Sequence, residues 1–159
     1  MSKELKLEFI EKSEKAALYT ICFNSDSVSE FTKFMLKYRN HAELNKDFQR
    51  IIYALNKCLE VGVLERYFRP EGKIKDNLCA LPIESGKLRL YCLRLSDKIL
   101  IIGNGGVKNS RTYNENPELS GYVITLQKFD EILKMEVKSG TITVEQMDIT
   151  GYEDKIFKI

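Results

Sequence analysis

The strongest constraint on this chain is a β-hairpin near its centre. Two apolar runs, Lys87–Leu95 and Lys98–Ile102, are separated by the polar pair Ser96–Asp97. Runs of this length, rich in leucine, isoleucine and tyrosine and joined by a short polar turn, are typical of antiparallel strands. The sequence therefore predicts an antiparallel hairpin, and the rest of the chain has to build a sheet around it.

The first strand of this hairpin has two different faces, because successive side chains of a strand point to opposite sides. One face carries Leu88, Leu90 and Cys92, and the other carries Lys87, Arg89 and Tyr91. We expect the apolar face to pack against helices and the other face to present cationic and aromatic groups. Arg94 has the parity of the apolar face, so we place it at the strand end beside the turn.

Further strands are indicated on both sides of the hairpin. Leu5–Ile10 alternates, Ala16–Phe23 is rich in β-branched and aromatic residues, and Leu78–Ile83 precedes the central hairpin. Thr141–Val144 is a candidate last strand. The tail from Gln146 either stays loose until a partner binds it or packs as a sheet edge.

Three amphipathic helices are predicted from apolar residues at helical spacing. The first follows a capping box formed by Ser27 and Glu30. The second runs from Asp47 to a stop at Gly62, and the third covers 126–137 and ends at Ser139–Gly140. The sequence thus predicts an α+β fold, in which a twisted antiparallel sheet of four to five strands packs against two N-terminal helices, with the additional C-terminal helix at the periphery.

A glycine-rich segment, Gly103–Gly106, follows the second hairpin strand. It is not a phosphate-binding loop, because no Gly-Lys-Ser/Thr follows and no helix is predicted to begin there. We interpret it as a strand end or bulge that needs positive φ angles.

Composition restricts the class of protein. The 159 residues, 43% of them hydrophobic, are enough for one domain with a core. No run of 18 apolar residues occurs and the N-terminus lacks an apolar signal segment, so we expect a cytoplasmic protein without a membrane partner. The cysteines form no Cys-x-x-Cys pair and His41 is the single histidine, so we expect neither a zinc site nor a disulfide framework, and no cofactor.

Positive charge is concentrated in the middle of the chain. Between Leu64 and Tyr113 there are ten Lys and Arg residues against five Asp and Glu residues, although the whole chain has a net charge of only +2. This asymmetry favours an anionic partner for the middle segment and leaves an acidic periphery.

The residues of this basic segment suit a phosphodiester. We predict that Lys87, Arg89, Lys108, Arg111 and Tyr113 converge at one sheet edge. Arginine offers a fixed fork of donors to phosphate oxygens, a lysine among other cations can transfer a proton, and tyrosine can stack on a base. Neither a Ser-His-Asp triad nor a pair of carboxylates is evident, and no residue stands out as a general base.

The order of short motifs resembles the RelE/HigB-like toxins of bacterial type II toxin-antitoxin systems. The segments that carry the resemblance are Glu65–Lys73, Ala80–Ile83, Gly86–Arg94, Lys98–Gly103, Val107–Ser110 and Asn116–Leu119. Residues 1–159 would then form a single RelE/HigB-like domain, with a C-terminal extension over about 114–159.

The resemblance implies a metal-independent messenger RNA endoribonuclease that acts in the ribosome, inhibits translation and is neutralised by a cognate antitoxin protein. It assigns phosphate stabilisation to Arg89 and a basic role to Lys108 and Arg111, with Tyr113 as the aromatic residue. Lys87 would assist proton transfer or phosphate binding. Further RNA contacts are expected from Arg69, Lys73, Lys75, Tyr91 and Arg94. Two alternatives stay open, namely a gyrase-poisoning ParE-like toxin and a catalytically inactive binding module with the same fold.

Overall fold

The computed structural model describes residues 3–72, 76–109 and 116–159. The elements are β1 (Glu4–Lys12), β2 (Ala17–Phe23), α1 (Glu30–Tyr38), α2 (Asn45–Val61), the 3₁₀ turn η1 (Glu65–Tyr67), β3 (Arg69–Pro70), β4 (Leu78–Leu81), β5 (Leu88–Arg94), β6 (Ile99–Val107), α3 (Pro117–Ser139), β7 (Thr143–Val144), β8 (Ile149–Thr150) and β9 (Phe157–Lys158). The predicted α+β class is confirmed.

The main sheet is larger than predicted and it is mixed. Over the described residues it has seven strands in the order β3-β4-β5-β6-β2-β1-β9, and β2 runs parallel to β6. The prediction of four to five antiparallel strands missed the outer strands β3 and β9, because pairs of residues have no periodicity to recognise. The prediction missed the parallel pairing because it joins two strands that belong to different hairpins and are distant in sequence, Ala17–Thr20 of β2 and Ile99–Ile102 of β6.

The central hairpin is confirmed, but its glycines serve a different purpose. Leu90 lies opposite Gly105 and Cys92 lies opposite Ile102, so β6 has a bulge there. None of the glycines in Gly103–Gly106 has a positive φ angle, which corrects that part of the prediction. A Cβ atom at Gly105 would lie 1.8 Å from the carbonyl oxygen of Arg89. Glycine is needed because the two backbones approach closely, not because of the φ angle.

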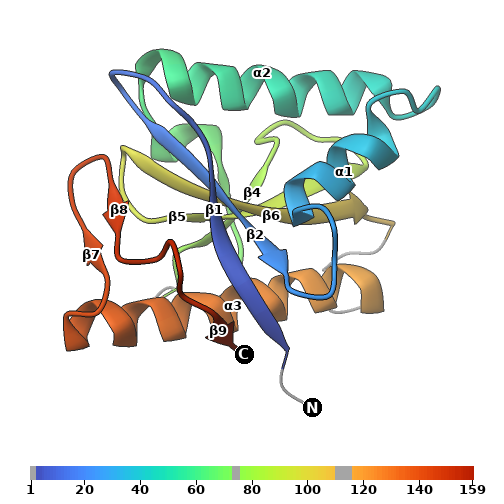
Figure 1. Cartoon of the computed structure of the whole chain (residues 1–159). Helices are drawn as coiled ribbons and strands as arrows, with labels where there is room; N and C mark the ends of the chain where they lie inside the picture. Colours follow the sequence, from blue (N-terminus) through green and yellow to red (C-terminus); the bar gives the residue numbers. More distant parts are fainter. Residues whose placement is uncertain (1–2, 73–75, 110–115) are drawn as a thin grey trace.

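Helices cover both faces of the sheet (Figure 1). Leu88, Leu90 and Cys92 pack against α1 and α2 on one face, as the alternation predicted. On the other face Tyr91 and Leu93 pack against α3. The prediction that the third helix lies at the periphery is therefore wrong. Its residues Leu119, Val123, Leu126, Phe129 and Leu133 belong to the core.

The helix ends differ from the predictions where a polar side chain caps a helix. Ser29, and not Ser27, caps α1 by accepting a hydrogen bond from the Thr32 amide. α2 ends at Gly62 as predicted. Asn116 caps α3, which begins at Pro117, well before the apolar repeat that identified this helix.

The C-terminal segment folds back on the sheet. Thr143–Val144 pairs with Ile149–Thr150 in a small separate hairpin, and Phe157 pairs with Leu5 at the edge of the main sheet. Of the two alternatives for the tail, packing as an edge is the one observed. In the described part of the chain, α3 and the other helices lack an apolar stretch that would span a bilayer.

Candidate functional site

Some of the residues predicted for the site lie close together in the structure, and others do not. Lys73, Lys75, Arg111 and Tyr113 lie outside the described residues. Arg69, Lys87, Arg89 and Lys108 lie around the end of the sheet where β5 begins and β6 ends. Tyr91 lies in the core on the α3 side of the sheet, and Arg94 lies at the far end of β5.

Arg89 is the most deeply placed of these cations. It is only 6% exposed, and its Nη1 donates to the carbonyl oxygens of Gly86 (2.8 Å) and Leu88 (2.9 Å). Its Nε has no hydrogen-bond partner among the described residues. Burial lowers the pKa of Arg89, and the nearby positive charge of Arg69 lowers it further. Arg89 thus supplies buried positive charge, with little of its guanidinium open to a ligand.

Arg69 lies on β3, the outermost strand of the sheet, and its side chain shares the sheet face of Arg89 on β5. Its Nε donates to Pro82 O (3.1 Å), and its Nη2 donates to Ile83 O (3.1 Å) and Glu84 O (3.2 Å). These bonds fix the 82–87 loop that leads into β5. The guanidinium remains half-buried and so is accessible from one side.

Lys87 and Lys108 flank the open end of the central hairpin. The Lys108 amide donates to Lys87 O at 2.6 Å, one step beyond the last β5–β6 pair. Lys87 is exposed and Lys108 is half-buried. Asp47 of α2 accepts from the amides of Lys87 (2.7 Å) and Leu88 (3.2 Å), so the start of β5 is anchored to the N-terminal turn of α2.

A carboxylate that the sequence did not indicate lies among these cations. Arg69 pairs with Ala80, whose side chain belongs to the core on the α3 side of the sheet. Glu71 continues this pairing through a bond from its amide to Leu78 O, so its side chain shares the face of Arg69 and Arg89. Burial raises the pKa of Glu71, and the positive charges of Lys108, Arg69 and Arg89 oppose this rise.

We call Arg69, Glu71, Arg89 and Lys108 the Glu71 cluster. It combines a carboxylate that holds its proton more tightly than usual with three cations from β3, β5 and the end of β6. Such a carboxylate is better suited to accept a proton near neutral pH than an ordinary glutamate is. The cations can stabilise negative charge that develops on a bound ligand.

Two of the residues predicted to contact RNA, Tyr91 and Arg94, are not members of the Glu71 cluster. Tyr91 is fully buried under α3, so its ring offers no surface on which a base could stack. Arg94 lies at the other end of β5, about 17 Å along the strand from Arg89. Its Nε donates to Val63 O at 2.8 Å, and it lines a cavity of about 340 Å³ that Glu71 lines as well, so this cavity connects Arg94 with the Glu71 cluster.

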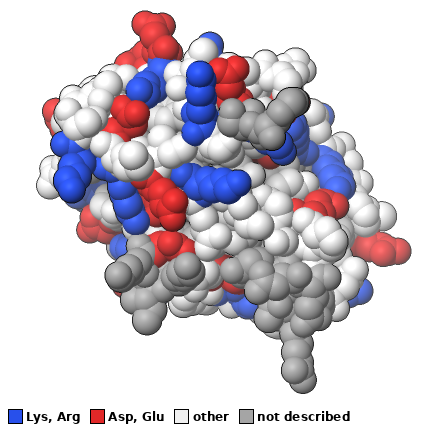
Figure 2. All heavy atoms as spheres, turned by 90° about the horizontal axis from the view of Figure 1, so that it is seen from below, with Lys and Arg blue, Asp and Glu red and all other residues white. Residues whose placement is uncertain are grey.

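The charge on the surface is mixed. Figure 2 shows the Lys and Arg side chains of the described residues interspersed with Asp and Glu on the face that carries α3. Within residues 3–72, 76–109 and 116–159, no three His, Cys, Asp or Glu side chains are arranged to hold a metal ion.

The chain was compared with protein-family models, with curated proteins and with solved structures. None of the three comparisons found a match.

Proposed function

We propose that the protein is a RelE/HigB-like messenger RNA endoribonuclease whose reaction takes place at the Glu71 cluster. The observation that carries this proposal is the pairing of Glu71 with Leu78, which places its carboxylate on the sheet face of Arg69 and Arg89. The positive charges of Lys108, Arg69 and Arg89 oppose the rise of its pKa that burial causes. A proton acceptor beside several fixed cations meets the two main requirements of phosphodiester cleavage by the ribose 2′-hydroxyl.

Each member of the cluster has a step in this reaction. The Glu71 carboxylate takes the proton of the 2′-hydroxyl, the O2′–P bond forms, and the P–O5′ bond breaks. The ammonium group of Lys108 gives a proton to the departing 5′ oxygen. Arg69 binds a phosphate oxygen, and the buried charge of Arg89 stabilises the negative charge of the transition state. The products are a 2′,3′-cyclic phosphate and a 5′-hydroxyl.

The arrangement of the elements supports the same assignment. Helices α1 and α2 pack on one face of the main sheet, which is the part of the RelE/ParE-like expectation that supports the proposal (Figure 1). The sheet itself has seven strands over the described residues and a parallel β2–β6 pair, and so differs from that expectation. The cluster lies toward the opposite face, beside α3. Under this proposal the protein acts on messenger RNA in the ribosome, and a cognate antitoxin neutralises it.

The proposal is tested by inducible expression followed by mapping of RNA ends. Wild-type protein should slow growth and create new 5′-hydroxyl ends, and Glu71→Gln should reduce cleavage about 10²- to 10⁴-fold. Glu14→Gln is the matched control, since Glu14 is an exposed carboxylate between β1 and β2, away from the cluster. A second pair is Lys108→Gln and Lys98→Gln, which remove a cation from opposite ends of β6. Equal cleavage by Glu71→Gln and Glu14→Gln would refute the proposal.

One observation favours a second candidate function, a binding module without catalytic activity. Arg89 is almost completely buried and Arg69 is already bonded to three carbonyl groups, which limits the donors left for a phosphate. Harmless expression of the wild-type chain with intact RNA would favour this function. Stalled replication with intact RNA would instead favour a gyrase poison.

A further inference from the structure

A groove of about 680 Å³ runs along the outer side of α2, away from the sheet. The helix and the 82–87 loop both line it, the helix with Lys46, Gln49, Arg50, Ile52, Tyr53 and Asn56 and the loop with Glu84. We call it the α2 groove. The buried residues of α2 are Phe48, Ile51, Leu55 and Cys58, so the groove occupies the opposite, solvent-facing side of this amphipathic helix.

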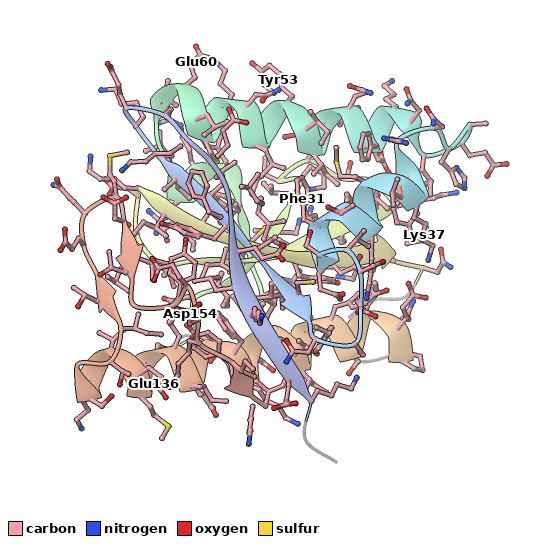
Figure 3. All side chains as sticks on the ribbon, viewed as in Figure 1. Phe31, Lys37, Tyr53, Glu60, Glu136 and Asp154 are labelled. Atoms are coloured by element: carbon pink, nitrogen blue, oxygen red, sulfur yellow. The ribbon has the colours of Figure 1, made fainter. Side chains whose placement is uncertain are left out.

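Tyr53 is the unusual residue of this groove. Its side chain is 64% exposed and projects from α2 away from the sheet (Figure 3). The ammonium group of Lys57 lies 5.8 Å from the centre of its ring and 3.5 Å from a carboxylate oxygen of Glu60. An exposed aromatic ring with a cation beside it is the arrangement on which nucleic-acid bases stack.

The polar residues of the groove suit the same ligand. Gln49 and Asn56 are exposed and carry amide groups that can bond to base edges. Lys46 is an exposed cation within reach of a phosphate. Glu84 is the carboxylate of the lining, and Arg50 lies 3.7 Å from Asp47, so Lys46 is the cation of the lining that is left to meet a phosphate. The charges of the groove are nearly balanced, and stacking on Tyr53 supplies the main part of the binding.

The α2 groove and the Glu71 cluster share one loop. Arg69 of the cluster donates to the carbonyl groups of Pro82, Ile83 and Glu84. On the other side of the loop, Arg50 donates to Ser85 O at 3.4 Å, and Asp47 accepts from the Lys87 amide. The loop thus forms a short bridge between the two sites, and the exposed Lys87 lies on it.

We infer that the α2 groove is a subsite for single-stranded RNA, in which one base of the strand stacks on Tyr53. A strand whose scissile phosphate lies at the Glu71 cluster continues over Lys87 into the groove. This inference rests on the proposed function, because the cluster supplies the reaction and the groove supplies additional binding of the same strand.

The test measures binding separately from cleavage. The probe is a labelled single-stranded RNA of about 12 nucleotides, of the size that such sites cover, with 2′-O-methyl groups that prevent attack by the 2′ oxygen. Tyr53→Ala should weaken binding about tenfold, and Tyr53→Phe, which keeps the ring, should bind as the wild type does. Phe9→Ala is the matched control, since Phe9 is 51% exposed on β1. Its affinity should equal that of the wild type.

A second variant tests the phosphate contact. Lys46→Gln should lower the slope of log affinity against log salt by about 0.7, the value for one phosphate contact of a single strand. Lys138→Gln, which removes an exposed cation from the last turn of α3, should leave the slope unchanged.

The outcomes separate this inference from the proposed function. If RNA is cleaved but Tyr53→Ala binds the methylated probe as tightly as the wild type, the subsite is refuted and the reaction at the cluster stands. If the probe binds through Tyr53 but no RNA is cleaved, the subsite stands and the proposed reaction fails. Absence of any binding of the probe refutes the subsite.

Discussion

The carboxylate of Asp47 accepts a hydrogen bond from the backbone amide of Lys87 at 2.7 Å, and it accepts a second one from Leu88 at 3.2 Å. The bonds join the N-terminal turn of α2 to the first residues of β5. Bonds to a carboxylate are stronger than those between neutral groups. Asp47 therefore fixes the end of the sheet at which the Glu71 cluster is assembled.

Replacement of Asp47 should destabilise the fold. Asp47→Ala leaves two amides of β5 without their acceptor, and we expect the free energy of unfolding to fall by about 2 kcal/mol. Urea denaturation measures the change, with Glu43→Ala, an exposed carboxylate ahead of the same helix, as the control. Equal midpoints for the two variants would show that the Asp47 bonds contribute nothing.

Two glycine substitutions should have opposite effects. Gly105→Ala forces a methyl group to within 1.8 Å of Arg89 O, and we expect a loss of about 3 kcal/mol or more. Gly121→Ala places the same methyl group on α3, where no atom lies within 4 Å, and should stabilise the helix by about 1 kcal/mol. Thermal unfolding of both variants tests the close approach of β5 and β6. A Gly105→Ala protein with the wild-type melting temperature would contradict it.

Long periodic elements were predictable because their own sequence determines them. The central hairpin, α2 and the inward face of Leu88, Leu90 and Cys92 are all as predicted. The parallel contact of β2 with β6 and the position of α3 depend on surfaces that are distant in the chain. Local patterns do not encode such contacts. They therefore indicate a peripheral position for α3, although Phe129 of this helix is fully buried.

The candidate site was predictable only in part, for a similar reason. The basic residues of the hairpin could be read from the alternation along one strand. Glu71 directly follows the two-residue outer strand β3. It comes close to Arg89 and Lys108 because β3 pairs with β4 and β4 pairs with β5, which the sequence pattern does not indicate. The one signal in the sequence was the spacing of Arg69 and Glu71, which places both on the same face of a strand.

The thiols should differ in their reactivity. Burial raises the pKa of Cys58 and of Cys79 to about 12, which leaves about one thiolate in ten thousand at pH 8. Cys92 is fully buried, whereas Cys22 is only half-buried. We expect a thiol reagent to modify Cys22 alone in the native protein and all four cysteines in urea. Rapid native labelling of Cys58, Cys79 or Cys92 would contradict the buried positions.

Glu71 should make the stability of the fold depend on pH. Because its pKa is higher in the folded protein than the ordinary value of 4.5, the folded state favours the protonated form. Its contribution to stability is present below the ordinary value and is lost as pH rises through the folded value. Glu71→Gln should therefore be at least as stable as the wild type at pH 7, with a smaller advantage near pH 4. A large loss of stability at pH 7 would show that the ionised carboxylate is needed structurally.

The most direct measurement is the pH profile of RNA cleavage by the purified protein, with and without ribosomes. Proton transfer to Glu71 requires the cleavage rate to rise with pH as this carboxyl ionises, with a midpoint above 4.5. Glu71→Gln should reduce the rate about 10²- to 10⁴-fold and should lose this rise, whereas Glu14→Gln should keep the wild-type rate and the rise. A Glu71→Gln protein that cleaves at the wild-type rate with the same pH profile would contradict the central claim.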